Sequence, residues 1–146
     1  MEREIIVMGR GEVRVLPDRA TFRVAVDGAG SSPEEAYEAA ARASAAVDAV
    51  MNGDDGFDRV HTAGVMVEPR TRWQDGEPIR SGWTASRAST VSVKDLSRLG
   101  DLLLLVATAG GGVSGIAWDL DPGHEAMDRA RHAAALDARR RAETYA

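Results

Sequence analysis

The sequence predicts an α+β fold in which helices cover one face of an antiparallel or mixed sheet. Two strand patterns in succession lead into a helix pattern, twice along the chain, and the regular strand-helix-strand alternation of a parallel sheet is missing. The expected element order is β-β-α-β-β-α-β-α. A length of 146 residues, with 44% hydrophobic and 28% charged residues, is typical of one folded domain, so residues 1–146 are expected to form a single domain.

Alternation of apolar and polar residues predicts the first two strands. From Ile5 to Val15 the odd positions hold apolar residues or glycine, and arginine and glutamate fill the even positions of the second half. Gly9 and Gly11 lie on the expected buried face, where a missing side chain marks a bulge, a bend or the close approach of another backbone, and a kinked first strand is expected. A second run, Ala20–Val26, alternates in the same way.

The first helix is predicted from Pro33 to about Met51. Ser32 supplies an N-cap oxygen, Pro33 suits the first helical position, and Glu35 completes a capping box. One face of this helix is expected to pack on the sheet through residues at helical spacing: Tyr37, Ala40, Ser44, Val47 and Met51.

The third and fourth strands are expected to form a hairpin, over Val60–Pro69 and Trp83–Val93. If both strands share an apolar face, paired residue numbers must add to an even value, and this condition centres the turn on Gly76. The expected register sets Val67 opposite Ala85 and Trp73 opposite Ile79. Core packing is the favoured interpretation of Trp73 and Trp83, and a role as interface anchors is the alternative.

A second helix is predicted from Leu96 to Ala109, with Asp95 as its cap. The positions expected to face the sheet are Leu96, Leu99, Leu102 or Leu103, and Val106. Leu104 and Leu105 fall outside this face. Because apolar residues on two sides of a helix indicate deep burial or a subunit contact, these two leucines are candidate interface residues.

Glycines from Gly110 to Gly112 are expected to end this helix. The run to Gly115 also satisfies the G-x-G-x-x-G string, but a dinucleotide site needs a strand before it and a helix after it, and here the order is reversed. A glycine C-cap is therefore favoured over nucleotide binding. Val113–Leu120 is the expected fifth strand, and Asp121-Pro122 is expected to start the third helix.

Composition limits the partners and the chemistry. Lysine and arginine number 18 against 23 aspartate and glutamate residues, and the net charge of −5 is the wrong sign for nucleic-acid binding. The absence of cysteine removes disulfides and thiolate chemistry. No apolar run is long enough to span a membrane, and no signal peptide is evident, so the chain as written is expected to be cytoplasmic. A periplasmic or cell-surface location is expected if a signal was removed or lies outside this chain.

One set of residues has the spacing of metal ligands. His124, Asp128 and His132 recur every four residues, which on a helix would let adjacent pairs share a divalent metal. This face is the basis of an alternative function, a metal-dependent or small-molecule-binding enzyme. Since no H-E-x-x-H arrangement is present, an ordinary polar helix face is favoured, and no catalytic residue, cofactor or metal is assigned.

Six segments resemble, in collinear order, the SIMPL-domain family: Val7–Thr21, Thr62–Arg70, Gly82–Ser86, Asp95–Gly100, Gly115–Pro122 and Asp137–Glu143. The most specific is the pattern G-x-G-x-V-x-V-x-P-D-x-A-T that begins at Gly9. The family includes bacterial periplasmic or surface-associated proteins, one of them an immunogenic protein that forms a ring-like or channel-like oligomer, and a mammalian adaptor of an interleukin-receptor-associated kinase.

The resemblance implies an assembly or interaction role, discussed in connection with oxidative or envelope stress, with no agreed enzymatic activity and no catalytic residues. It also implies further strands after the third helix, which residues 1–146 are expected to lack. The resulting hypothesis is a non-enzymatic module that self-associates into a homo-oligomer. Binding of another protein is a further expectation. Its candidate interface residues are Leu104, Leu105, Trp73 and Trp83.

Overall fold

The computed structural model describes residues 4–145, and the chain divides into two compact units. The sheet unit comprises Asp18–Asp119. The helix unit combines the residues before Asp18 with those after Asp119.

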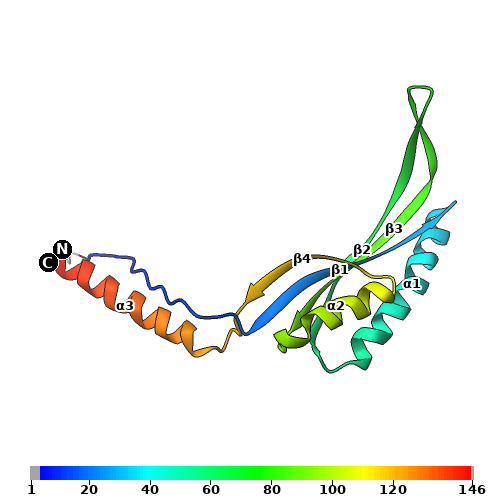
Figure 1. The fold of residues 1–146 in the computed structure, drawn as a ribbon. Coiled ribbons are helices and arrows are strands. Elements are labelled where there is room, and N and C mark those ends of the chain that lie inside the picture. Colours follow the sequence, from blue (N-terminus) through cyan, green and yellow to red (C-terminus); the bar gives the residue numbers. More distant parts are fainter. Residues whose placement is uncertain (1–3, 146) are drawn as a thin grey trace. The chain divides into compact units, whose positions relative to one another are not determined.

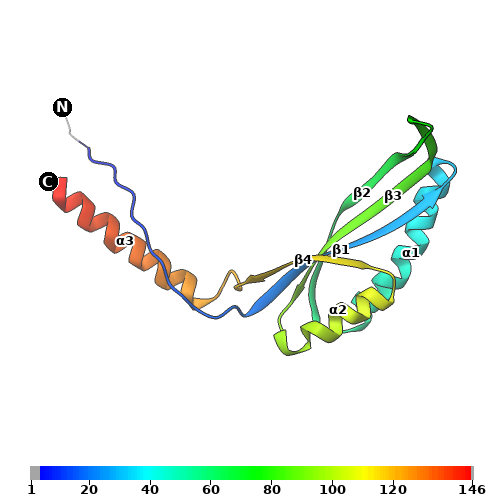
Figure 2. The same ribbon diagram turned by 45° about the horizontal axis from the view of Figure 1, so that its top comes forward.

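The sheet unit contains four antiparallel strands in the order β2-β3-β1-β4. Their bounds are β1 Arg19–Gly30, β2 Phe57–Gln74, β3 Glu77–Val93 and β4 Gly112–Asp119. Two α-helices, α1 Pro33–Gly53 and α2 Leu99–Thr108, lie on the same face of the sheet (Figures 1 and 2). The prediction of an α+β fold with helices on one sheet face is therefore confirmed.

The core lies between this sheet face and the two helices. Alternate residues of β1 are buried there, as their period of two predicts, and they meet residues of β3, α1 and α2. The largest fully buried side chains are Phe22, Leu102, Val24, Val47, Val91, Val93 and Val106. Each such side chain contributes about 1.5–3 kcal/mol through its removal from water, so these contacts hold the sheet unit together.

Helix α1 begins where its capping sequence predicts. The Glu35 backbone N–H donates to Ser32 Oγ at 3.2 Å, and the Glu35 carboxylate accepts bonds from the Ser31 hydroxyl at 2.6 Å and the Ser31 N–H at 2.9 Å. These bonds, above all that from the Ser31 hydroxyl, hold the pKa of Glu35 below its ordinary value. Each stabilises the first turn by satisfying an otherwise unpaired donor.

The buried face of α1 is the expected one except at its first position. Ala40, Ser44, Val47 and Met51 are buried, but Ala36 takes the place expected for Tyr37, which is 52% exposed. The reason lies in β1, where two glycines bring the strand so close to the helix backbone that only an alanine fits the facing turn. The prediction that Tyr37 is a core residue is wrong.

The β2–β3 hairpin keeps the expected register in its middle part, residues 64–70 of β2, and departs from it toward both ends. Val67 lies opposite Ala85, as predicted, but Trp73 lies opposite Pro78 rather than Ile79. The register shifts by one residue after Arg70, because the turn is a two-residue Asp75-Gly76 turn in which both residues have positive φ. The shift leaves one residue of β3, Ser81, without a partner in the ladder, which forms a β-bulge.

The outer part of this hairpin extends beyond the other strands. Strand β1 pairs with β3 only from Trp83 to Val93, so residues 70–82 pair within the hairpin itself. Figure 1 shows the hairpin reaching past the end of β1.

The second helical region has the predicted inward face. A short 3-10 turn, Leu96–Arg98, is capped by Asp95, whose carboxylate accepts a bond from the Ser97 N–H at 3.1 Å. Leu99, Leu102 and Val106 of α2 are then buried.

Glycines end α2 as predicted. The Gly110 and Gly111 N–H groups donate to the carbonyls of Ala107 and Val106, both at 3.0 Å, and Gly110 has a φ of +100°. The C-cap interpretation of this glycine run is confirmed.

In the helix unit, the extended residues 4–17 pack against one helix, α3 Glu125–Tyr145. Residues 4–17 are extended, but no residue among those described forms a strand ladder with them, so the first predicted strand is not part of a sheet. Of the alternatives considered for Gly9 and Gly11, the structure shows the close approach of another backbone, because a methyl group at either would overlap the backbone of α3. The Arg10 N–H also donates to Asp137 Oδ2 at 2.9 Å.

Helix α3 begins three residues later than the sequence suggested. Asp121 starts a turn instead: its carboxylate accepts a bond from the Gly123 N–H, and its carbonyl accepts one from the His124 N–H, both at 2.8 Å. A carboxylate that bonds its own following backbone competes with helix formation, so the helix starts at Glu125.

Candidate functional site

The two candidate leucines of α2 point away from the core. Leu104 is 67% exposed and Leu105 is 43% exposed, although Leu102 and Val106 on the other side of the helix are fully buried. The prediction that these leucines fall outside the inward face is confirmed. A ten-residue helix thus carries apolar side chains on a solvent-facing surface.

Strand β4, which packs beside α2, adds two more exposed apolar side chains. It is a terminal strand of the sheet unit, and Ile116 and Trp118 are 47% and 61% exposed. Trp118 lies opposite the buried Ala20 and therefore shares the helix-covered face of the sheet. We call these four side chains, Leu104, Leu105, Ile116 and Trp118, the α2–β4 surface.

The two candidate tryptophans of the hairpin have different environments. Trp83 is partly buried against Ala36, Ala40 and Ala85, and the Arg80 guanidinium lies 5.3 Å from the centre of its ring. Core packing is thus the correct interpretation of Trp83. Trp73 is 75% exposed on the outer hairpin, so core packing is wrong for Trp73.

The predicted metal-ligand face is not assembled. His124 lies before the first residue of α3, and its Nδ1 accepts a bond from the Ala126 N–H at 3.0 Å, so it caps the helix instead of projecting from its side. Asp128 is paired with Arg131 at 2.8 Å. Within residues 4–145 no group of three or more histidine, aspartate or glutamate side chains is placed to hold a metal ion.

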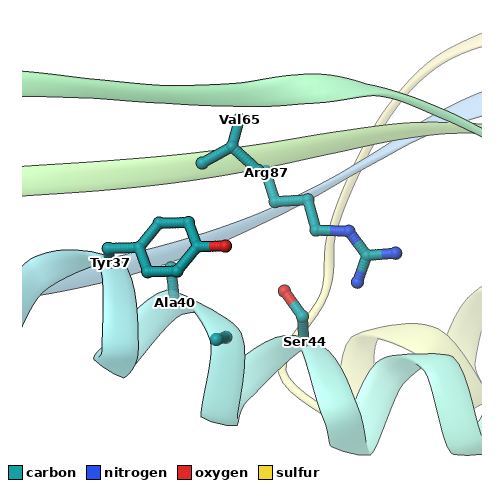
Figure 3. A pocket seen from close by; sticks show the side chains of 6 residues that line it. Tyr37, Ala40, Ser44, Val65 and Arg87 are labelled. Atoms are coloured by element: carbon teal, nitrogen blue, oxygen red, sulfur yellow. The ribbon is translucent and has the colours of Figure 1, made fainter.

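A cavity that the sequence analysis missed lies between α1 and the β2–β3 strands. Its volume is about 240 Å³, and its lining is Tyr37, Ala40, Ala41, Ser44, Val65 and Arg87. Three of these residues face a common space in Figure 3: the ring of Tyr37, the hydroxyl of Ser44 and the side chain of Arg87. No local pattern marks it, since its walls come from three separated parts of the chain.

Arg87 is fixed at the wall of this cavity by two partners. Its Nη1 donates to Asp48 Oδ2 of α1, and its Nη2 donates to Thr62 Oγ1 of β2 at 3.2 Å. Arg87 lies opposite Val65 in the ladder, so both side chains are on the helix-covered face. The charge of Arg87 is therefore held in place before any ligand arrives.

A second fixed charge cluster joins the loop after α1 to the start of the second helical region. Arg98 Nη2 contacts Asp54 Oδ1 at 2.7 Å, and its Nη1 contacts Asp55 Oδ1 at 3.0 Å. The pKa of Asp54 is lowered, first by a hydrogen bond from the Gly56 N–H and then by Arg98. The pKa of Arg98 is raised by both carboxylates, Asp55 first. This cluster stabilises the packing of the loop after α1 against the second helical region. None of its three residues lines the cavity described above.

A comparison of the sequence with profiles of known protein families shows which family the chain belongs to. The sequence profile of the SIMPL family, described as protein of unknown function (DUF541), matches residues 5–146. The chain belongs to the SIMPL family. The match spans both units of this SIMPL chain, so the recognition made from its collinear segments is confirmed.

The family assignment brings no activity with it, because the function of the family is unknown. None of the curated proteins compared with this SIMPL chain matches it. None of the helices described in residues 4–145 is long and apolar enough to cross a membrane. That residues 1–146 fold as one domain stays a prediction.

Proposed function

We propose that this SIMPL chain is a non-enzymatic module that self-associates through the α2–β4 surface. The observation that carries the proposal is the exposure of Leu104 and Leu105 on a helix whose opposite side is fully buried. Burial of apolar side chains between copies contributes about 25 cal/mol for each Å² removed from water. Leucine, isoleucine and tryptophan side chains left in solvent on neighbouring elements are therefore a source of association free energy.

The chemistry of the surface favours a second copy of the chain as the partner. Its four side chains carry no charge, so two copies can meet about a two-fold axis without matching opposite charges. Strand β4 is terminal in its sheet, but a bulge with Gly115 at a φ of +64° interrupts it. Since bulges hinder continuous strand pairing, side-chain contacts are expected to dominate the interface.

Light scattering over a concentration series tests the proposal. The unmodified chain is expected to show a multiple of its chain mass, and Leu104→Glu/Leu105→Glu is expected to show the mass of one chain. Leu136→Glu is the matched control, because Leu136 is also a half-exposed helical leucine but lies in the helix unit. A monomeric unmodified chain, or an unchanged mass in the double variant, would contradict self-association through this surface.

Trp73 supports a second candidate function, a binding site for another protein. The outer hairpin presents this ring in solvent, and exposed aromatic residues are frequent anchors of protein interfaces. Capture of a partner by the unmodified chain and not by Trp73→Ala would favour this function. Equal capture by both would remove Trp73 as the anchor. Any link to stress or to the cell envelope stays an expectation from the family resemblance.

A further inference from the structure

The cavity between α1 and β2 is separate from the α2–β4 surface. Strands β2 and β4 form opposite edges of the sheet, and the cavity lining contains no residue of α2 or β4. Binding of a ligand in the cavity is therefore expected not to depend on self-association.

Ser44 is the first indication of a ligand. It is only 3% exposed, and its Oγ has no hydrogen-bond partner among the residues described. The two buried positions that precede it on the same helix face are alanines, Ala36 and Ala40. A buried hydroxyl without a partner destabilises a protein, and alanine is also the better helix former. A serine here is thus unfavourable for the unliganded fold, and Figure 3 shows its oxygen directed toward the cavity.

Each of the three polar side chains around the cavity, those of Tyr37, Ser44 and Arg87, can donate hydrogen bonds, and the two hydroxyls can also accept them. The guanidinium of Arg87 can only donate, and its bonds to Asp48 and Thr62 leave further N–H groups for a ligand. The hydroxyls of Tyr37 and Ser44 can also donate (Figure 3). Ala40, Ala41 and Val65 supply apolar wall. A complementary ligand presents acceptor oxygens at one end and a compact apolar group at the other.

We propose that this cavity binds a small carboxylate that carries a compact apolar group, such as an aromatic ring. Arginine pairs with a carboxylate through charge-assisted hydrogen bonds, and the apolar group would lie against Ala40, Ala41 and Val65. A volume of about 240 Å³ suits a molecule of the size of benzoate. Because Asp48 already balances the charge of Arg87, the affinity is expected to be modest, with a Kd on the order of 1 mM.

Titration of the nitrogen-15-labelled chain, followed by amide chemical shifts, tests the site with three probes. Sodium benzoate is the carboxylate with a ring, benzamide is its neutral isostere, and sodium acetate lacks the ring. Benzoate is expected to give saturable shifts around Ser44 and Arg87, with both other probes at least about fivefold weaker, because each lacks one of the two recognised features. No saturable shift with benzoate overturns the site, and equal binding of benzamide overturns the preference for a carboxylate.

Substitution of Ser44 separates a binding role from a structural one. Ser44→Ala is expected to weaken benzoate binding several-fold and to raise the Tm of the unliganded chain by roughly 3 °C, because it removes the unpaired hydroxyl. Ser86→Ala is the matched control on the other face of β3, and it is expected to leave benzoate binding unchanged. Unchanged benzoate affinity in Ser44→Ala, or a lower Tm, would overturn the role proposed for this hydroxyl.

Discussion

Gly28 of β1 and Ala40 of α1 meet backbone to backbone. A methyl group on Gly28 would overlap the Ala40 nitrogen and the Ala36 carbonyl oxygen, and Gly30 approaches the same helix one turn earlier. The helix unit repeats this relationship, since Gly9 and Gly11 approach Ala134 and Ala130 of α3. In both units a pair of glycines on an extended segment allows an alanine-rich helix to pack closely against that segment.

This contact makes Gly28→Ala destabilising. The added methyl group has backbone as its neighbour, which cannot rotate aside, so the strand and helix must separate at a cost of about 1–3 kcal/mol in the free energy of unfolding. Urea denaturation measures the change. Gly53→Ala is the control, because a methyl group there meets nothing within 4 Å. A loss of stability in the control as large as that in Gly28→Ala would refute the close-approach explanation.

Truncation of two leucines of α2 is expected to change the free energy of unfolding by very different amounts. Leu102 is fully buried in the core, so Leu102→Ala leaves a cavity and is expected to cost about 2–5 kcal/mol. Leu104→Ala removes an exposed side chain of the same size and is expected to change the free energy of unfolding by less than about 0.5 kcal/mol. Thermal or urea unfolding at low protein concentration measures both. Similar losses in the two variants would mean that α2 does not have the orientation described.

The tryptophans of the hairpin are expected to differ in the same sense. Trp83→Ala removes the ring that covers Ala36, Ala40 and Ala85, and because the ring is only partly buried we expect a loss of about 2 kcal/mol. Trp73→Ala is expected to leave stability almost unchanged but to remove the fluorescence of one of the two solvent-exposed rings, the other being that of Trp118. Unfolding curves, and fluorescence quenching by acrylamide in a Trp118→Phe background that removes the third tryptophan, separate the two. Equal quenching of both rings would contradict the burial of Trp83.

The pKa of Asp54, lowered first by the hydrogen bond from the Gly56 N–H and then by Arg98, leads us to expect a pH dependence of stability. The pKa of Asp54 in the folded chain is lowered from 3.8, so the stabilisation is fully present above about pH 3.8 and is lost as the pH falls through the folded pKa. Asp54→Asn is therefore expected to be less stable than the unmodified chain near neutral pH, with the difference shrinking in acid. Asp55→Asn is the comparison, because its carboxylate is 97% exposed and screened by water.

Unfolding midpoints measured between pH 7 and pH 2.5 test this dependence. A difference between Asp54→Asn and the unmodified chain that stays constant over the whole range would show that the Asp54 carboxylate gives no pH-dependent stabilisation.

Local patterns predicted much of the sheet unit. The first residue of α1 follows from Ser32, Pro33 and Glu35, and the inward face of α2 follows from helical spacing, because both depend on residues within one or two turns. Pairing of Val67 with Ala85 followed from two conditions: a shared apolar face, which a shift of one residue would expose, and a turn centred on Gly76.

Other features depended on contacts that no local pattern contains. Tyr37 is turned out of the core by the approach of β1 glycines that lie before the helix in sequence. His124 leaves its expected helix face because the Asp121 carboxylate bonds its own turn. Residues 4–17 have the alternation of a strand, but a strand ladder needs a neighbouring chain segment, and alternation cannot supply one.

By itself, the sequence determined the family, the caps of α1 and of the second helical region, most of the apolar faces, and the position of Leu104 and Leu105 outside the inward face of α2. Each of these depends on residue identity and on spacings of a few residues. Only the tertiary structure decided that Ser44, Val65 and Arg87 line one cavity and that the outer hairpin leaves Trp73 in solvent. The physical reason is that a cavity or an exposed surface is set by which distant segments pack together, and this choice minimises the free energy of the whole chain rather than of any one segment.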